Sequence, residues 1–182
     1  TMQALIDIVK QGKALYVGIS KYPPAQAKIA YEMLRAAGVP CLISQYRYSM
    51  FDRTVEEKSL PLAAEQGSGF IAFSPLAQGL LTKKYLHGIP EHSRAARSTG
   101  FLKVDQVTED KVGKARRLDE IAARRGQTLA EMALAWVLKD ERMTSVIVGT
   151  SSLKQLADNL HSLHNLNFTD AELTEIEGIL RL

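Results

Sequence analysis

Cysteine is almost absent from this sequence of 182 residues, which contains one, Cys41. A single cysteine allows no internal disulfide and fits a reducing compartment, so we expect a cytoplasmic protein. Cys41 lies in an apolar run and is interpreted as a small buried side chain. No signal peptide is visible, and no apolar run approaches the ~20 residues that span a bilayer, so no membrane association is expected.

Several motifs that mark enzyme classes are also missing. No C-x-x-C or H-E-x-x-H pattern indicates a metal, and there is neither a G-x-S-x-G elbow nor a P-loop. His161 and His164 lie on one predicted helix without further metal-ligand partners nearby, and are interpreted as surface or packing residues. The sequence therefore predicts no metal site, nucleophile or general acid.

The charge distribution argues against a nucleic-acid partner. The net charge is only +3. Arginine pairs at 116–117 and 124–125 lie on one predicted helix, but Asp119 and Glu120 separate them and no aromatic residue is interleaved. Because a nucleic-acid footprint needs one concentrated basic surface, these pairs are interpreted as a solvated helix face.

Four short apolar runs are present, at residues 15–20, 41–46, 69–75 and 145–150. None alternates cleanly between apolar and polar residues, which is typical of strands covered on both faces in parallel α/β sheets. Pro23 and Pro24 begin a helical stretch that runs to Gly38. Capping-box patterns predict four more helix starts, at Thr54 with Glu57, Thr128 with Glu131, Ser152 with Gln155, and Thr169 with Glu172.

Alternating strands and helices predict an α/β fold with parallel strands and right-handed crossovers. A doubly wound dinucleotide fold would normally carry G-x-G-x-x-G after a strand, and this sequence has none. A (β/α)8 TIM barrel needs eight strands and typically ~250 residues. Four strands therefore predict half of a barrel, forming a single domain over residues 1–182.

Each predicted strand ends in polar residues, and ligands bind at the carboxyl ends of strands in both architectures. Any one of these residues can simply cap the next helix, but four such ends meeting at one rim indicate a binding site. The last loop, "GTSSLKQ", places glycine and small hydroxyls before a helix whose free N–H groups favour a phosphate. Lys84 and Arg94 can add full positive charges, and arginine suits bidentate phosphate contacts.

The segments "GISKY", "SQYRYSMF", "FSPLAQGLLTKKY", "GIPEHSRA" and "VIVGTSSLKQLADN" resemble, in order, the C-terminal half of the aldo-keto reductases. They are most similar to the branch that contains bacterial L-glyceraldehyde 3-phosphate reductases and potassium-channel β-subunits. The resemblance covers essentially the whole chain. It implies the C-terminal half of a (β/α)8 barrel that binds NADPH across its carboxyl face and reduces small aldehydes or ketones.

The resemblance also implies a set of cofactor-binding residues. At the nicotinamide end these are Ser20, Lys21, Gln45 and the stacking ring of Phe73. On the pyrophosphate and adenosine side they are Ser74, Pro75, Leu76, Gln78, Lys84 and Arg94. At the 2′-phosphate and adenine they are Gly149, Ser151, Gln155, Asp158 and Asn159. Lys83 stands where the family often has glycine, and Gln155 stands where it sometimes has arginine. The second difference weakens the expected preference for NADPH but does not remove it.

The tyrosine acid of the family and its lysine, histidine and aspartate partners belong to the N-terminal half, which the match leaves out. We therefore expect a fragment that is inactive alone, and neither Tyr46 nor Tyr85 is taken as a substitute acid. Two alternatives remain open. One is an NADPH-binding regulatory module like a channel β-subunit. The other is a homo-oligomer in which the open sheet edges of two copies close one barrel.

Overall fold

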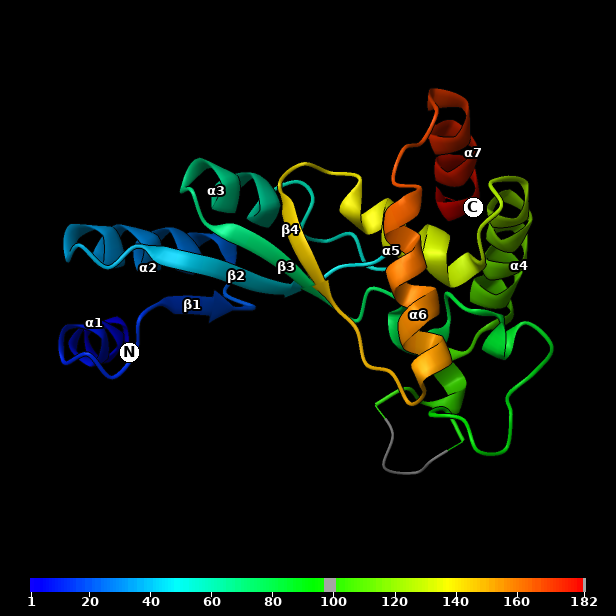
Figure 1. The fold of residues 1–182 in the computed structure, drawn as a ribbon, viewed down its shortest axis with the longest axis horizontal. Coiled ribbons are helices and arrows are strands. Elements are labelled where there is room, and N and C mark those ends of the chain that lie inside the picture. The colour runs from blue at the N-terminus through cyan, green and yellow to red at the C-terminus, as the bar shows by residue number, and fades with distance from the viewer. Residues whose placement is uncertain (97–100, 182) are drawn as a thin grey trace.

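The computed structural model describes residues 1–96 and 101–181, and a sheet of four parallel strands lies at its centre (Figure 1). The strands are β1 (Val17–Ser20), β2 (Cys41–Arg47), β3 (Gly69–Phe73) and β4 (Met143–Ile147). They are hydrogen-bonded in the order β1-β2-β3-β4, and every pair is parallel. This arrangement confirms the predicted α/β fold and corresponds to the four-strand part of a (β/α)8 barrel.

Seven α-helices accompany the sheet in the described ranges: α1 (Met2–Lys10), α2 (Pro24–Ala36), α3 (Ser59–Glu65), α4 (Glu109–Arg124), α5 (Leu129–Leu138), α6 (Leu153–His161) and α7 (Asp170–Arg181). In Figure 1, α1 to α3 lie along the strands, whereas α4 to α7 gather beyond the end toward which β2 and β3 point. The described residues of the insertion between β3 and α4 form three short 3-10 turns, at Ala77–Gly79, Lys83–Tyr85 and Val104–Gln106.

Two of the predicted capping boxes are complete. Thr128 Oγ1 accepts a hydrogen bond from the Glu131 amide at 3.2 Å, and Glu131 Oε2 accepts one from the Thr128 amide at 2.7 Å. Thr169 and Glu172 form the same reciprocal pair at 3.2 and 2.7 Å. Each box satisfies two backbone donors that a helix start would otherwise leave unpaired, and this fixes where α5 and α7 begin.

The predicted helix start at Thr54 is wrong. The helix α3 begins at Ser59, and the Thr54 hydroxyl instead donates to Asp52 Oδ1 at 3.0 Å. Pro61 explains the difference, because it occupies the first turn of a helix that begins at Ser59, where its missing N–H has no intrahelical partner. A helix that began beside Thr54 would place Pro61 in its interior, where proline removes a hydrogen bond and clashes with the preceding turn.

The two faces of the sheet have different surroundings. The face that packs on the helices is buried and includes Val17, Ile19, Ser44, Tyr46, Phe70 and Ala72. The opposite face is half-buried or exposed and includes Gly18, Ser20, Ile43, Gln45, Arg47, Ile71, Phe73, Ser145 and Ile147. The prediction that both faces are covered is therefore wrong for the residues that the structure describes. In a closed barrel this second face lines the interior, which explains its apolar residues.

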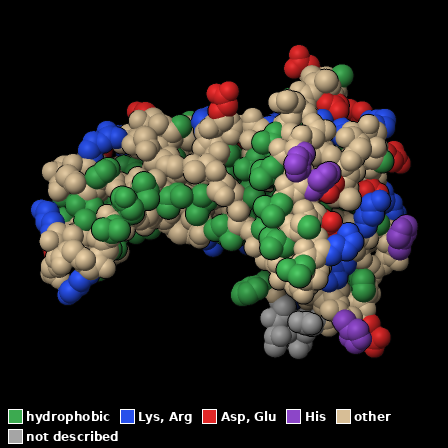
Figure 2. All heavy atoms as spheres, in the orientation of Figure 1, with side chains coloured by type: hydrophobic (Ala, Val, Ile, Leu, Met, Phe, Trp, Pro, Cys, Tyr) green, Lys and Arg blue, Asp and Glu red, His purple; other side chains and the backbone are tan. Residues whose placement is uncertain are grey.

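A second apolar surface lies on α6 and the turn after it. Leu153, Leu156, Leu160 and Leu163 are all exposed, at spacings of three and four residues that place them on one side of the helix. Figure 2 shows hydrophobic side chains gathered over α6 and along the strands. A stripe of this kind normally faces another element, so α6 has an unpartnered face in the described part of the chain. Closure of one barrel by two copies remains a prediction.

Candidate functional site

A cleft of about 890 Å³ lies at the carboxyl ends of β3 and β4. Its walls come from four parts of the chain: the segment that follows β3, the insertion around Arg94, the first turn of α5, and the loop that leads from β4 into α6. The volume falls in the range of known small-molecule and cofactor sites, about 300–1,000 Å³. β3 and β4 thus deliver their polar ends to one shared space.

Twelve of the fifteen residues predicted from the resemblance line this cleft. They are Phe73, Ser74, Pro75, Leu76, Gln78, Lys84, Arg94, Gly149, Ser151, Gln155, Asp158 and Asn159. They come from two strand ends, a helix and an insertion that are up to 86 positions apart in the sequence (Phe73 to Asn159). Their assembly in one place supports a common ligand rather than a series of unrelated helix starts.

The other three predicted residues, Ser20, Lys21 and Gln45, lie at the ends of β1 and β2, outside the lining of the cleft. They contact one another: Ser20 Oγ donates to Gln45 Oε1 at 3.4 Å, and the Lys21 amide donates to the Gln45 carbonyl at 3.0 Å. Gln45 pairs with Ile71, two residues before Phe73 on the same face of β3. These side chains therefore continue the rim of the sheet beyond the cleft.

Backbone strain is concentrated at the strand ends. Lys21, Ser74, Ala77 and Gln78 have φ values of +58°, +55°, +46° and +59°, in the left-handed region that residues other than glycine rarely adopt. Each such residue costs on the order of 1–3 kcal/mol, and conformations of this kind cluster at ligand sites. Three of the four lie in the turn after β3, where they redirect the chain over the cleft. This turn explains why an apolar strand stops abruptly at Ser74.

Arg94 carries positive charge from the insertion to the loop after β4. Its neighbours Ser93 and Ala95 are buried and fix the backbone on either side of the exposed arginine. The guanidinium lies close to Gly149, since a Cβ built on that glycine would be 3.9 Å from Arg94 Nη2. Arg94 thus spans the cleft from one wall to the other, where an anionic ligand would meet it.

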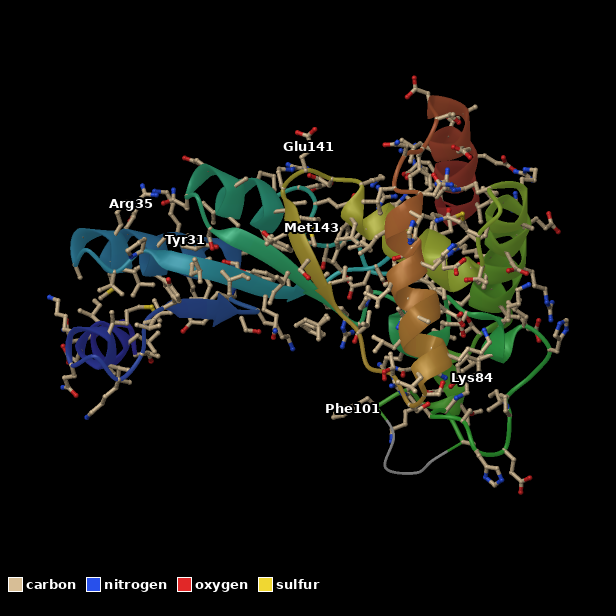
Figure 3. The ribbon with its side chains drawn as sticks, viewed as in Figure 1. Tyr31, Arg35, Lys84, Phe101, Glu141 and Met143 are labelled. Atoms are coloured by element: carbon tan, nitrogen blue, oxygen red, sulfur yellow. The ribbon has the colours of Figure 1, made fainter. Side chains whose placement is uncertain are left out.

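The two neighbouring lysines differ in their partners. Lys83 Nζ lies 3.5 Å from Asp119 Oδ2 on α4, so much of its charge is already balanced. Lys84 is exposed, and its amide donates to Thr82 Oγ1 at 3.2 Å. Figure 3 shows its side chain beside the N-terminal end of α6, which the shared cleft lining confirms. Lys84 is therefore the better placed of the two to meet a ligand phosphate.

The N-terminus of α6 is partly capped by its own side chains. Ser152 Oγ accepts a hydrogen bond from the Gln155 amide at 3.2 Å, and Gln155 Oε1 accepts from the amide and hydroxyl of Ser151 at 2.9 and 3.1 Å. Gln155 therefore does not complete the predicted capping box with Ser152. Instead its carbonyl oxygen occupies the place beside Ser151 that an anion would take, and a phosphate bound there would replace this contact.

Neither Tyr46 nor Tyr85 has the setting of a catalytic acid. The Tyr46 hydroxyl donates to the Tyr22 carbonyl at 2.8 Å, and burial raises the pKa of Tyr46 to about 12. The Tyr85 oxygen accepts a hydrogen bond from the Ala95 amide at 3.4 Å, so this tyrosine supports the insertion that carries Arg94. Neither residue lines the cleft.

The cleft and its border also include residues that were not predicted from the sequence. Thr82, His92 and Thr128 line the cleft, and Arg47 lies at the end of β2 beside it. Arg47 was detectable, because it follows Gln45 by two residues and period two places both on one face of a strand.

Within residues 1–96 and 101–181 no group of three or more His, Cys, Asp or Glu side chains is placed to hold a metal. No helix in these ranges is long and apolar enough to cross a membrane.

Barrel enzymes frequently bind phosphate groups in the loops that follow their last two strands, and the cleft of this chain lies in the loops that follow β3 and β4. Comparison with known sequences identifies the class: the pattern of the Aldo/keto reductase family matches residues 1–181, and the chain belongs to this family. It is 46% identical over 181 residues to L-glyceraldehyde 3-phosphate reductase of Escherichia coli O157:H7, and 45% identical to the protein of that name in strain K12. Each alignment covers 97% of this chain and 52% of the relative, so the chain spans about half the length of these relatives.

Proposed function

We propose that this chain is the cofactor-binding half of an NADPH-dependent aldo-keto reductase that reduces small aldehydes or ketones. The observation that carries the proposal is the single cleft that collects twelve of the predicted cofactor residues. Its volume suits an extended nucleotide, and Lys84 and Arg94 supply charge for its phosphates. The names of the relatives suggest a phosphorylated three-carbon aldehyde as substrate.

In this proposal the residues of the chain bind the cofactor and orient it. Phe73 offers a ring face at the nicotinamide end of the cleft, and the Gln45 amide can both donate to and accept from a carboxamide. Ser74 and Gln78, held in the strained turn, present polar groups to the pyrophosphate. The bound cofactor supplies the hydride, while the protein supplies its position and shields it from water. The proton acid belongs to the half of the family barrel that the match leaves out.

The proposal predicts measurable NADPH binding by the 182-residue chain. Calorimetry should show weak binding to the wild-type protein, and Arg94→Ala should weaken it about tenfold or more, the loss expected for a charge-assisted hydrogen bond of ~1.5–3 kcal/mol. Arg117→Ala is the matched control, because Arg117 is exposed on α4 outside the cleft and its removal should leave the affinity unchanged. A flat titration at millimolar NADPH would contradict the proposal.

We also infer a cytoplasmic location from the lone Cys41, which is buried and free. Fractionation of the native host with an antibody to the chain tests this inference, and recovery outside the cytoplasm would overturn it.

A further inference from the structure

A second, smaller pocket of about 120 Å³ adjoins the cofactor cleft. Ser74 and Gln78 line both spaces, so the two communicate across the strained turn after β3. The rest of its lining comes from the end of β2, the loop that follows it, the insertion between β3 and α4, and the start of α4. Its size excludes a dinucleotide and suits a single small group.

Arg47 lies at the border between these two spaces. It is the last residue of β2 and pairs with Phe73 in the sheet, and its guanidinium carbon lies 5.9 Å from the centroid of the Phe73 ring. The Arg47 side chain is 53% exposed. Its guanidinium is therefore anchored beside the ring expected to contact nicotinamide, yet remains open to a ligand.

The partners of Arg47 leave its charge largely available. Its ion pair among the described residues is with Asp52, and Nε lies 3.8 Å from Oδ2, beyond hydrogen-bonding distance. A second cation, Lys111, lines the same pocket. Its Nζ donates a hydrogen bond to the neutral backbone carbonyl of Gln106 at 3.3 Å, a contact that does not balance its charge. Two cations face one carboxylate, so the pocket carries a net positive charge and favours an anion.

We propose that Arg47 is a specificity-determining residue that selects substrates bearing a phosphate monoester, with Lys111 as its second cation. This inference rests on the proposed function and assigns a substrate class to it. The planar fork of an arginine matches two phosphate oxygens, which gives both attraction and orientation. A phosphate held by Arg47 would place the rest of a short substrate next to Phe73. A neutral aldehyde of the same length would lack this anchor.

The pyrophosphate of the cofactor is a second source of phosphate for this pocket, because Ser74 and Gln78 line both spaces. Titration with glycerol 3-phosphate, followed by NMR with and without saturating NADPH, separates the sources. We expect the wild-type chain to bind glycerol 3-phosphate in both conditions and glycerol in neither. Arg47→Ala should weaken glycerol 3-phosphate binding about ten- to a hundredfold while NADPH affinity stays unchanged.

Two further variants sharpen the result. Arg47→Lys keeps the charge but loses the fork, so its affinity for glycerol 3-phosphate should fall between those of wild type and Arg47→Ala. Asp52→Asn removes the competing carboxylate and should tighten binding severalfold. Arg117→Ala, remote on α4, is the matched control and should behave as wild type.

Specific outcomes would overturn the inference. Equal glycerol 3-phosphate affinity in Arg47→Ala and wild type would show that Arg47 does not bind the phosphate group. A parallel loss of NADPH and glycerol 3-phosphate binding in Arg47→Ala would assign the pocket to the cofactor pyrophosphate instead. If the wild-type chain fails to bind NADPH, the proposed function fails, but the titration without cofactor still decides the role of Arg47.

Discussion

The 182-residue chain alone is expected to reduce a reactive aldehyde at a rate at least a hundredfold below that of a full-length relative. The proposed function places the proton donor outside this chain, and a positioned general acid contributes about 10²–10⁴-fold. Tyr46 cannot replace it, because its hydroxyl is buried on a backbone carbonyl and its pKa is raised to about 12 by burial. Tyr85 is buried and does not line the cleft.

NADPH oxidation with a small aldehyde at micromolar protein measures this rate. The stronger form of the experiment adds the separately produced N-terminal half of the Escherichia coli relative, with that half alone as control. The exposed sheet face and the α6 stripe offer it a surface, so we expect activity to rise on mixing. Turnover by the chain alone at the level of a full-length enzyme would contradict the prediction. Cofactor binding without turnover, even in a full-length form, would favour the regulatory module instead.

Replacement of Phe70 by alanine is expected to cost about 3–5 kcal/mol of the free energy of unfolding, the range for deleting a buried aromatic side chain. Phe70 is 0% exposed, and its ring stacks on Tyr46 with the centroids 5.1 Å apart and the planes 7° from parallel. Domains have a total stability of about 5–15 kcal/mol, so the loss is a large part of what holds the sheet to its helices.

Urea denaturation followed by circular dichroism provides the measurement. Phe101→Ala is the matched control, because this phenylalanine is 91% exposed at the lower edge of the molecule in Figure 3 and its removal should change stability by less than about 0.5 kcal/mol. Similar midpoints for Phe70→Ala and Phe101→Ala would contradict the packing described above.

The sequence predicted the parts of the fold that depend on local pattern and strand order. Buried strands have a simple apolar signature, and strands that alternate with helices must run parallel. Parallel strands share one edge for their carboxyl ends, which is why the sequence alone predicts Ser74 and Ser151 in one cleft. The capping box at Thr128 is equally local, since it joins residues three apart.

Features that depend on long-range packing were less accessible. Nothing near Arg94 in the sequence shows that its guanidinium approaches Gly149 across the cleft. The uncovered face of the sheet depends on which other elements pack against it, and apolar strands alone do not specify them. At Thr54 the capping-box pattern is local, whereas the start of α3 is set by Pro61, which lies outside that pattern.

In the proposed function, the turn after β3 and the start of α6 hold two different parts of one bound nucleotide. Amide NMR of the ¹⁵N-labelled chain during an NADPH titration tests it most directly. Signals of Phe73, Ser74 and Gln78 from the first segment and of Gly149, Ser151 and Gln155 from the second should shift along one binding curve with a single dissociation constant. No shift at millimolar NADPH, or shifts confined to one of the two segments, would contradict it.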